Sequence, residues 1–184
     1  MIKCKKDLND YLAADLSEAY VPKGRFQRWL HGLGGNEQCA AYSYVRRLRY
    51  MEYYLNTGKK LRYHWSHFLI GRKGLRLGIR ISPNVAGKGL NIIHLSGGGG
   101  CYVNCESMGD YCRIQSGVVI GNKGSNENRP IIGNHVRFGL GCKVYGKITI
   151  GDNVTILPNA VVIHDVPANA IVGGVPAKII KYKE

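Results

Sequence analysis

The chain has 184 residues, of which 45% are hydrophobic, and it carries a formal net charge of +14. This length fits one domain with an extension. No run of about 18 uninterrupted apolar residues occurs, so no membrane-spanning helix is expected. The N-terminus also lacks the apolar segment of a secretory signal peptide, and we therefore expect a cytoplasmic protein.

The positive charge is concentrated in the first half of the chain. Residues 1–90 carry seventeen Lys or Arg against six Asp or Glu, whereas residues 91–184 carry nine against six. Such a basic half is either a solvated surface or attracts an anionic partner. We expect the phosphates of a cofactor and a peripheral contact with the inner face of the membrane, and no nucleic acid.

Residues 1–78 are predicted to form a basic, mostly helical N-terminal extension without repeats. Apolar residues recur at mixed spacings of three and four over 37–56, which predicts a helix, and 58–71 is a second helical candidate. We expect Trp29 and Trp65 to pack on the following repeats or on a partner subunit rather than to bind a ligand.

Residues 79–184 are predicted to form a domain built on a six-residue period. A bulky apolar residue returns at every sixth position, another small or aliphatic residue stands two places before it, and mostly turn-forming residues stand two places after it. Six is three strand periods and not a helical period, so each repeat gives two inward side chains and a corner. Three such faces close into a triangular turn of about 18 residues, the geometry of a hexapeptide β-helix. The bulky residues are Ile132, Phe138, Val144, Ile150, Ile156 and Val162, and their partners are Val136, Cys142, Ile148, Val154 and Ala160.

The same register continues upstream through Met108, Ile114 and Ile120. Between Ile120 and Ile132, the segment GNKGSNENRP has no apolar residue, so we expect a polar loop that leaves one corner without disturbing the register. Loops that interrupt a repeat array are often functional. Glycines that directly follow three of the bulky residues are expected to allow unusual backbone angles. These are Gly133, Gly139 and Gly151.

Six cysteines are present without a C-x-x-C pair. Cys101, Cys105 and Cys112 could bind zinc together with His94. The alternative is that they are small buried thiols in a reducing compartment. We favour buried thiols and expect no metal.

Three features together resemble the serine acetyltransferase-like group of left-handed β-helix acyltransferases. They are the hexapeptide register, the segment GKGLNIIHLSGG, and the ending NAVVIHDVPANAIVGGVPAKII. The resemblance covers about residues 79–184 and implies a mainly β protein: a left-handed parallel β-helix of hexapeptide repeats with an N-terminal α-helical extension. It also implies a homotrimer that transfers an acetyl group from acetyl-CoA to a hydroxyl. The first half loosely resembles the extension of members encoded with surface-polysaccharide pathways.

The resemblance implies that His94 is the general base. A neutral imidazole suits proton removal near pH 7. Ser96 and four glycines follow His94, which leaves the backbone around it open to a ligand. His135 is expected to be an ordinary surface residue.

The resemblance further implies positions for the donor and the acceptor. For the lysines, the physical argument is their charge against the phosphates of CoA. The expected CoA-binding residues are Leu140, Pro158, Ile163, His164, Lys178 and Lys181, and the expected acceptor-side residues are Asn128 and Arg129.

On the acceptor side, the sequence departs from the amino-acid enzymes of this family. Those enzymes carry an aspartate where Ile93 stands, an Arg-His pair where Asn128-Arg129 stands, and an orienting aspartate with no counterpart in LGIRISPNV. These departures favour a saccharide hydroxyl in surface-polysaccharide biosynthesis. The alternatives are a serine O-acetyltransferase of cysteine biosynthesis and a non-catalytic basic membrane-binding trimer. A zinc carbonic anhydrase is disfavoured, because the repeats lack closely spaced histidines.

Overall fold

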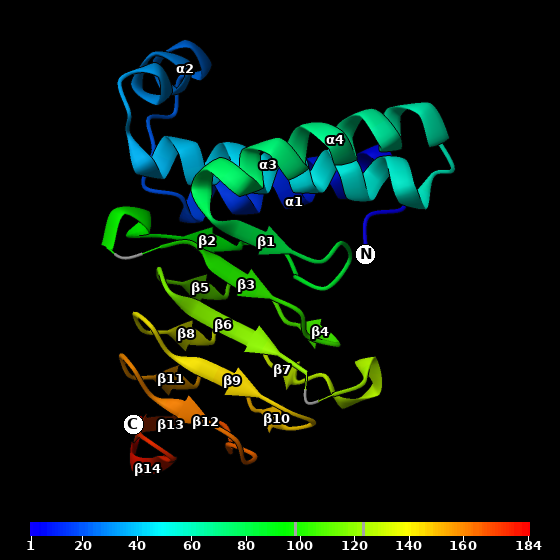
Figure 1. Ribbon diagram of the computed structural model, residues 1–184. Coiled ribbons are helices and arrows are strands. Elements are labelled where there is room, and N and C mark those ends of the chain that lie inside the picture. The colour runs from blue at the N-terminus through cyan, green and yellow to red at the C-terminus, as the bar shows by residue number, and fades with distance from the viewer. Residues whose placement is uncertain (98, 123) are drawn as a thin grey trace.

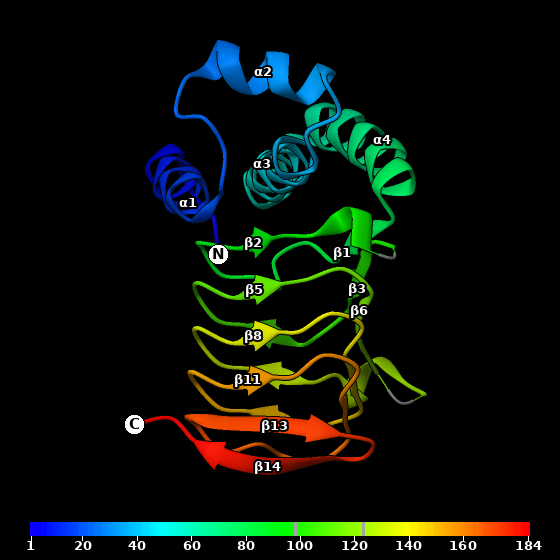
Figure 2. The ribbon, with the colours of Figure 1, turned by 90° about the vertical axis from the view of Figure 1, so that its left-hand side faces the viewer.

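The structure is a computed structural model that describes residues 1–97, 99–122 and 124–184. Four helices are stacked on one end of a column of short strands, and the C-terminal strands close the other end (Figures 1 and 2). The helices are α1 (Lys5–Glu18), α2 (Arg25–Leu33), α3 (Glu37–Asn56) and α4 (Lys60–Leu77). None of the helices in the described ranges has both the length and the apolar character needed to cross a membrane.

The strands form a β-helix with three sheets, and one full turn of the chain is called a coil below. In Figure 1 the strands of the sheet nearest the viewer point to the right, a second sheet lies behind them, and later coils lie lower. The winding is therefore left-handed. The predicted fold class is thus confirmed. Sheet A contains β1 (Ile79–Ile81), β3 (Cys101–Val103), β6 (Val118–Gly121), β9 (Lys143–Tyr145) and β12 (Val161–Val162). Sheet B contains β4 (Ser107–Met108), β7 (Ile131–Ile132) and β10 (Thr149–Ile150). Sheet C contains β2 (Asn91–Ile92), β5 (Arg113–Ile114), β8 (Arg137–Phe138), β11 (Thr155–Ile156), β13 (Ala170–Gly174) and β14 (Ala177–Tyr182).

The strand register confirms the predicted coil length. Ile131 pairs with Thr149 and Lys143 with Val161, a spacing of 18 residues. Ser107 pairs with Ile131, a spacing of 24, because the coil that contains the segment 121–130 is six residues longer. The loop therefore leaves the register undisturbed, as the sequence predicted.

The inward rows are those that the six-residue period predicted. Every bulky residue of the period and every partner two places before it is buried, including the upstream residues Met108, Ile114 and Ile120. They form one continuous core that also contains helix residues such as Val45, Leu48 and Met51. The helices and the repeats thus share one core. The division of the chain at residue 78 into two domains stays a prediction.

The explanation predicted for Gly133, Gly139 and Gly151 is wrong. None of them has a positive φ; such angles occur instead at other corner residues, including His135 and Asn153. A Cβ on any of the three glycines would come within 2.3–2.6 Å of an atom of the next coil. They are therefore required for the close stacking of coils and not for their own backbone angles.

The helical layer extends beyond what the sequence predicted. Helix α3 has the predicted bounds, and α4 includes most of the second candidate and continues to Leu77. The expectation that Trp29 and Trp65 pack on the repeats is wrong for the single chain, because both are largely exposed. Their predicted packing on a partner subunit stays a prediction.

A buried ionic network joins the helices to the first coil. Arg49 of α3 donates to Asp15 of α1 at 2.8 Å, to Glu52 at 3.1 Å, and to the carbonyl oxygen of Ala86 at 2.9 Å. Two further bonds, to Asp15 and to the carbonyl oxygen of Gly87, use the remaining donors of the guanidinium. Burial opposes the charge of Arg49, but the two carboxylates raise its pKa above the ordinary value, whereas burial raises the pKa of Glu52.

The last coil is closed by a reversal of the chain. Strand β14 pairs antiparallel with β13, whereas the other paired strands of the described chain are parallel. Most of β14 is exposed, including Lys178 and Lys181. The ending DVP…IVGGVPAK, one of the three features that carry the resemblance, thus closes the coil.

The network predicts a large effect of a single substitution in α3. Arg49→Met should lower the free energy of unfolding by about 3–5 kcal/mol, because it leaves two buried carboxylates without a cation. The matched control is Arg47→Ala, an exposed arginine in the same helix, which should change stability by less than about 0.5 kcal/mol. Urea unfolding followed by circular dichroism measures both, and equal effects of the two variants would contradict the role of the network.

Candidate functional site

His94 lies at one edge of the coil, two residues after the end of β2. It is exposed and has a φ of 58°, which turns the chain sharply away from sheet C. Ile92, Ile114, Phe138 and Ile156 are paired in one row across neighbouring strands of sheet C. His94, Leu140 and Pro158 each stand two places after a member of this row, so they lie on the same edge. This edge, formed by His94, Ser116, Leu140 and Pro158, is called the His94 corner. Here the structure brings together the predicted base and two of the predicted CoA contacts.

A carboxylate from the helical layer reaches the segment that follows His94. Asn36 caps α3 by accepting from the amide of Cys39 at 2.9 Å, which places Glu37 in the first helical turn. Glu37 accepts from the Ser96 amide at 2.8 Å and also from the Ser96 hydroxyl. These bonds, together with a smaller attraction to a cationic His94, lower the pKa of Glu37 below its ordinary value. The carboxylate therefore stays ionised near His94 at neutral pH.

A second polar group at this corner lies inside the coil. Ser116 is 1% exposed and follows the same row, between His94 and Leu140. Among the described residues, the Ser116 hydroxyl is the buried side-chain oxygen for which the chain supplies no hydrogen-bond partner. Leaving such a group unpaired costs about 1–3 kcal/mol, so Ser116 is a local cost to stability at this corner.

Sequence reasoning missed both Glu37 and Ser116. Glu37 is 59 residues from Ser96, and no periodic pattern connects them. Ser116 stands two places after Ile114, where the period predicts a corner, so its burial could not be read from the period.

The acceptor-side candidates lie elsewhere in the single chain. The loop 121–130 follows β6 at the opposite end of sheet A from η1 (Leu95–Gly97), and it projects away from the coil (Figure 1). Asn128 donates to the Ser125 hydroxyl at 3.4 Å, and Arg129 forms an ion pair with Glu106. One chain therefore does not bring Asn128 and Arg129 to His94.

The remaining CoA candidates are also divided between places. Ile163 and His164 are exposed and follow β12, at the same end of sheet A as the loop. Lys178 and Lys181 lie on β14, five strand steps from β2 along sheet C, which corresponds to roughly 24 Å at about 4.8 Å per step. Of these four residues, only Lys178 and Lys181 lie on sheet C, the sheet that contains β2. No contact in the structure tests any of these assignments.

The cysteines do not form a metal site. Cys101, Cys105 and Cys112 are buried inside the coil, and burial raises the pKa of each thiol to about 12. Within the described ranges, no group of three or more His, Cys, Asp or Glu side chains could hold a metal ion. The interpretation as buried thiols explains these residues.

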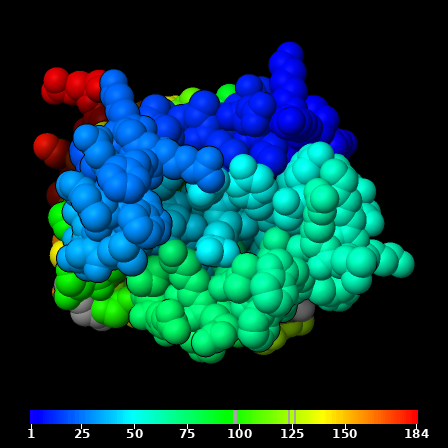
Figure 3. All heavy atoms as spheres, turned by 90° about the horizontal axis from the view of Figure 1, so that it is seen from above, coloured from blue at the N-terminus to red at the C-terminus, as the bar shows by residue number. Residues whose placement is uncertain are grey.

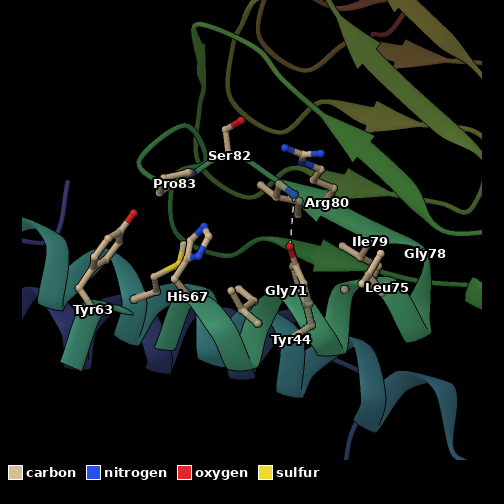
Figure 4. A pocket seen from close by; sticks show the side chains of 14 residues that line it. Tyr44, Tyr63, His67, Gly71, Leu75, Gly78, Ile79, Arg80, Ser82 and Pro83 are labelled. Atoms are coloured by element: carbon tan, nitrogen blue, oxygen red, sulfur yellow. Dashed lines mark hydrogen bonds between the residues drawn. The ribbon is translucent and has the colours of Figure 1, made fainter. Parts of the chain in front are cut away.

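Two hollows lie away from the His94 corner. One, of about 560 Å³, lies between α4 and β1 and has a mainly apolar lining that includes Tyr63, His67, Ile70 and Arg80 (Figure 4). The Tyr44 hydroxyl accepts from the Ile81 amide at 3.2 Å on its inner wall. The other, of about 170 Å³, lies on sheet C beside the end of α1 and includes Arg113, Arg137 and His135. None of the predicted site residues lines either hollow, and we place the site at His94 because the imidazole is exposed there and an ionised carboxylate is bonded to Ser96, two residues further along the chain.

Comparison with known proteins gives relatives for part of the chain, although no family model matches. Serine acetyltransferase of Synechococcus elongatus is 39% identical over 109 residues, which are 58% of this chain and 44% of that protein. Serine acetyltransferase of Helicobacter pylori is 40% identical over 106 residues, which are 56% of this chain and 61% of that protein. The chain thus spans about half the length of the curated relatives it matches.

Solved structures support the fold of the whole chain. The serine acetyltransferase of Neisseria gonorrhoeae superimposes with a TM-score of 0.74 over 98% of this chain and 69% of its own, at 24% identity. A serine acetyltransferase in complex with CoA superimposes with a TM-score of 0.71 over 96% of this chain and 71% of its own, at 22% identity. The likeness includes the helical layer, so this chain has a serine acetyltransferase-like β-helix and helical cap.

Proposed function

We propose that this protein is an acetyl-CoA-dependent O-acetyltransferase of the serine acetyltransferase type. The observation that carries the proposal is His94: an exposed imidazole on a sharp turn of the coil, beside the ionised Glu37, in a β-helix similar to serine acetyltransferases. A complex of one similar protein with CoA supports the choice of donor.

The reaction needs one proton transfer and one acyl transfer. Neutral His94 removes the proton of the acceptor hydroxyl while its oxygen attacks the thioester carbonyl carbon of acetyl-CoA. The tetrahedral intermediate then collapses, the carbon–sulfur bond breaks, and the thiolate of CoA receives the proton from the imidazolium. The products are an O-acetyl ester and CoA, without a covalent enzyme intermediate. Glu37 holds the segment after His94 through its two bonds to Ser96 and so positions the imidazole.

The proposed position of CoA follows the His94 corner down the coil. Leu140 and Pro158 offer exposed surface on successive coils below His94 for the pantetheine arm. Lys178 and Lys181 offer positive charge to the phosphates further along sheet C. Ile163 and His164 lie at the other end of sheet A, so they could contribute only from a neighbouring copy.

We also propose a homotrimer whose sites form between copies. Its support is the separation of the candidates: His94 lies at one end of sheet A, and Asn128, Arg129, Ile163 and His164 lie at the other. A neighbouring copy that brings its loop to the His94 corner would complete the set.

Serine is the acceptor that the comparisons favour. The relatives carry that activity in their names, and one similar structure contains serine. A saccharide hydroxyl is the second candidate and has no support among the comparisons. The observation that favours it is Ile93, which is buried directly before His94 and cannot pair with the ammonium group of an amino acid.

Replacing the proposed base should abolish most of the activity. His94→Ala should lower kcat by roughly 10²–10⁴ with little change in acetyl-CoA affinity, because only proton removal is lost. The matched control is His135→Ala, since His135 is also exposed and also has a positive φ of 55°. Release of the CoA thiol from acetyl-CoA measures both, and near wild-type turnover of His94→Ala would refute the assignment.

A second variant tests how His94 is positioned. Glu37→Gln keeps the shape of the side chain and removes its charge, which weakens the bonds that hold Ser96 behind His94. kcat should therefore fall while the KM for acetyl-CoA changes little, because positioning of the base is lost and donor binding is not. An unchanged kcat would show that Glu37 does not position His94.

The assembly is directly measurable. Sedimentation equilibrium at micromolar protein should give the mass of three chains. A monomer at that concentration would contradict a site formed between copies.

The acceptor can be identified by steady-state kinetics. L-serine should be acetylated, with the product identified by mass spectrometry, and a panel of sugars and nucleotide sugars should be poor acceptors. A kcat/KM above about 10⁴ M⁻¹s⁻¹ is typical of a true substrate. Sugars reaching that value while serine stays inert would replace the proposal with the second candidate.

A further inference from the structure

Helix α2 exposes an apolar stripe that no described part of the chain covers. Phe26, Trp29, Leu30 and Leu33 are 69%, 59%, 53% and 68% exposed, and they follow the i, i+3, i+4, i+7 spacing of one helical face. None of the nine residues of α2 is buried. A packed helix of a globular protein would turn such a stripe toward the core.

The charge around this stripe has a single sign. Between Glu18 and Glu37 the chain carries Lys23, Arg25 and Arg28 and no acidic residue. Lys23 and Arg25 are exposed beside the stripe. A short helix with Trp, Phe and Leu on one face and basic residues around it is typical of helices that lie in a membrane–water interface.

The position of α2 leaves it accessible. It is the outermost element at the end of the molecule opposite β14 (Figure 2), and it covers part of the surface in the view from above (Figure 3). Arg28 fixes its orientation by donating to the Pro22 carbonyl oxygen at 2.8 Å and by stacking over the Tyr42 ring at 5.6 Å. The stripe is therefore held outward by the underlying helices.

Helix α4 supplies a second, similar surface on this helical layer. Leu61, Trp65, Phe68 and Leu75 are exposed along it. Residues 60–77 contain five Lys or Arg and no acidic residue. Exposed apolar side chains and unbalanced positive charge thus occur together on two helices of the same layer.

A second copy of the chain and a nucleic acid explain these observations less well. Two copies joined through α2 and α4 would bring together residues 19–36 and 60–77, which contain no acidic residue, and like charges in contact disfavour binding. A nucleic acid would pair with the basic residues but would leave the aliphatic side chains of Leu30 and Leu33 in water. A bilayer with anionic lipids accommodates both the charge and the apolar stripe.

We propose that α2 anchors the protein to the surface of membranes that contain anionic lipids, with Phe26, Trp29, Leu30 and Leu33 inserted at the headgroup boundary. The apolar face enters to a depth of about 5–10 Å, and the neighbouring basic residues contact the lipid phosphates. This inference does not depend on the proposed catalytic activity.

The test is binding of the full chain to vesicles of phosphatidylcholine alone and of phosphatidylcholine with phosphatidylglycerol in equal parts. We expect co-sedimentation with the mixed vesicles only, weakening as salt rises, because surface charges are screened within about 3 Å at 1 M salt. In Trp65→Phe, the fluorescence of the remaining Trp29 should shift to shorter wavelength on binding. Failure to bind the mixed vesicles at low salt would overturn the proposal.

Matched variants separate α2 from the rest of the surface. Phe26→Ser combined with Trp29→Ser should lower the vesicle partition coefficient at least about tenfold while leaving the thermal unfolding midpoint nearly unchanged, because neither residue is buried. The control Tyr182→Ser removes an exposed aromatic residue at the opposite end and should bind normally. Normal binding by the double variant would overturn the role of α2. So would loss of self-association in the double variant without any effect on vesicle binding, which would identify the face as a contact between copies.

Discussion

The helical layer and the β-helix depend on the charge of one buried arginine. Arg49 is 0% exposed, and its five donors are used by Asp15, Glu52 and the carbonyl oxygens of the first coil. A buried charge of this kind is tolerated only if every bond is made, so the relative positions of α1, α3 and residues 86–87 are tightly constrained. The further bond from the Leu90 amide to Asp15, at 3.0 Å, carries this constraint to the strand that precedes His94.

That constraint connects the scaffold to the candidate site. Helix α3, which is fixed by Arg49, begins with Glu37, and Glu37 holds the segment after His94 through Ser96. The end of β2, the turn at His94 and the first turn of α3 therefore form one unit. A site built in this way is positioned by two different elements, a coil edge and a helix terminus, rather than by the coil alone.

The sequence predicted the β-helix because its signal is local and repeated. Residues such as Phe138 and Ile156 reveal their inward direction through neighbours only six places away, and the register followed directly from that period. Arg49 and Asp15 are 34 residues apart, and Glu37 and Ser96 are 59 apart, so no period links them. The glycines were misinterpreted for a related reason, since Gly139 is required by the next coil and not by its own strand. For the site, the resemblance implied His94, whereas the bond between Glu37 and Ser96 behind it is visible only in the folded chain.

The reversal of the chain at β14 has a consequence for assembly. A parallel β-helix that ended on β13 would present a row of unpaired backbone groups, and another coil could continue the stack, as in an open-ended filament. Strand β14 runs the opposite way and carries the exposed Lys178 and Lys181 along the outer edge, where charge discourages further pairing. The other end of the stack is covered by the helices. The lysines proposed to meet CoA therefore also terminate growth of the stack, and their replacement by apolar residues would favour fibres even where the folded chain is unchanged.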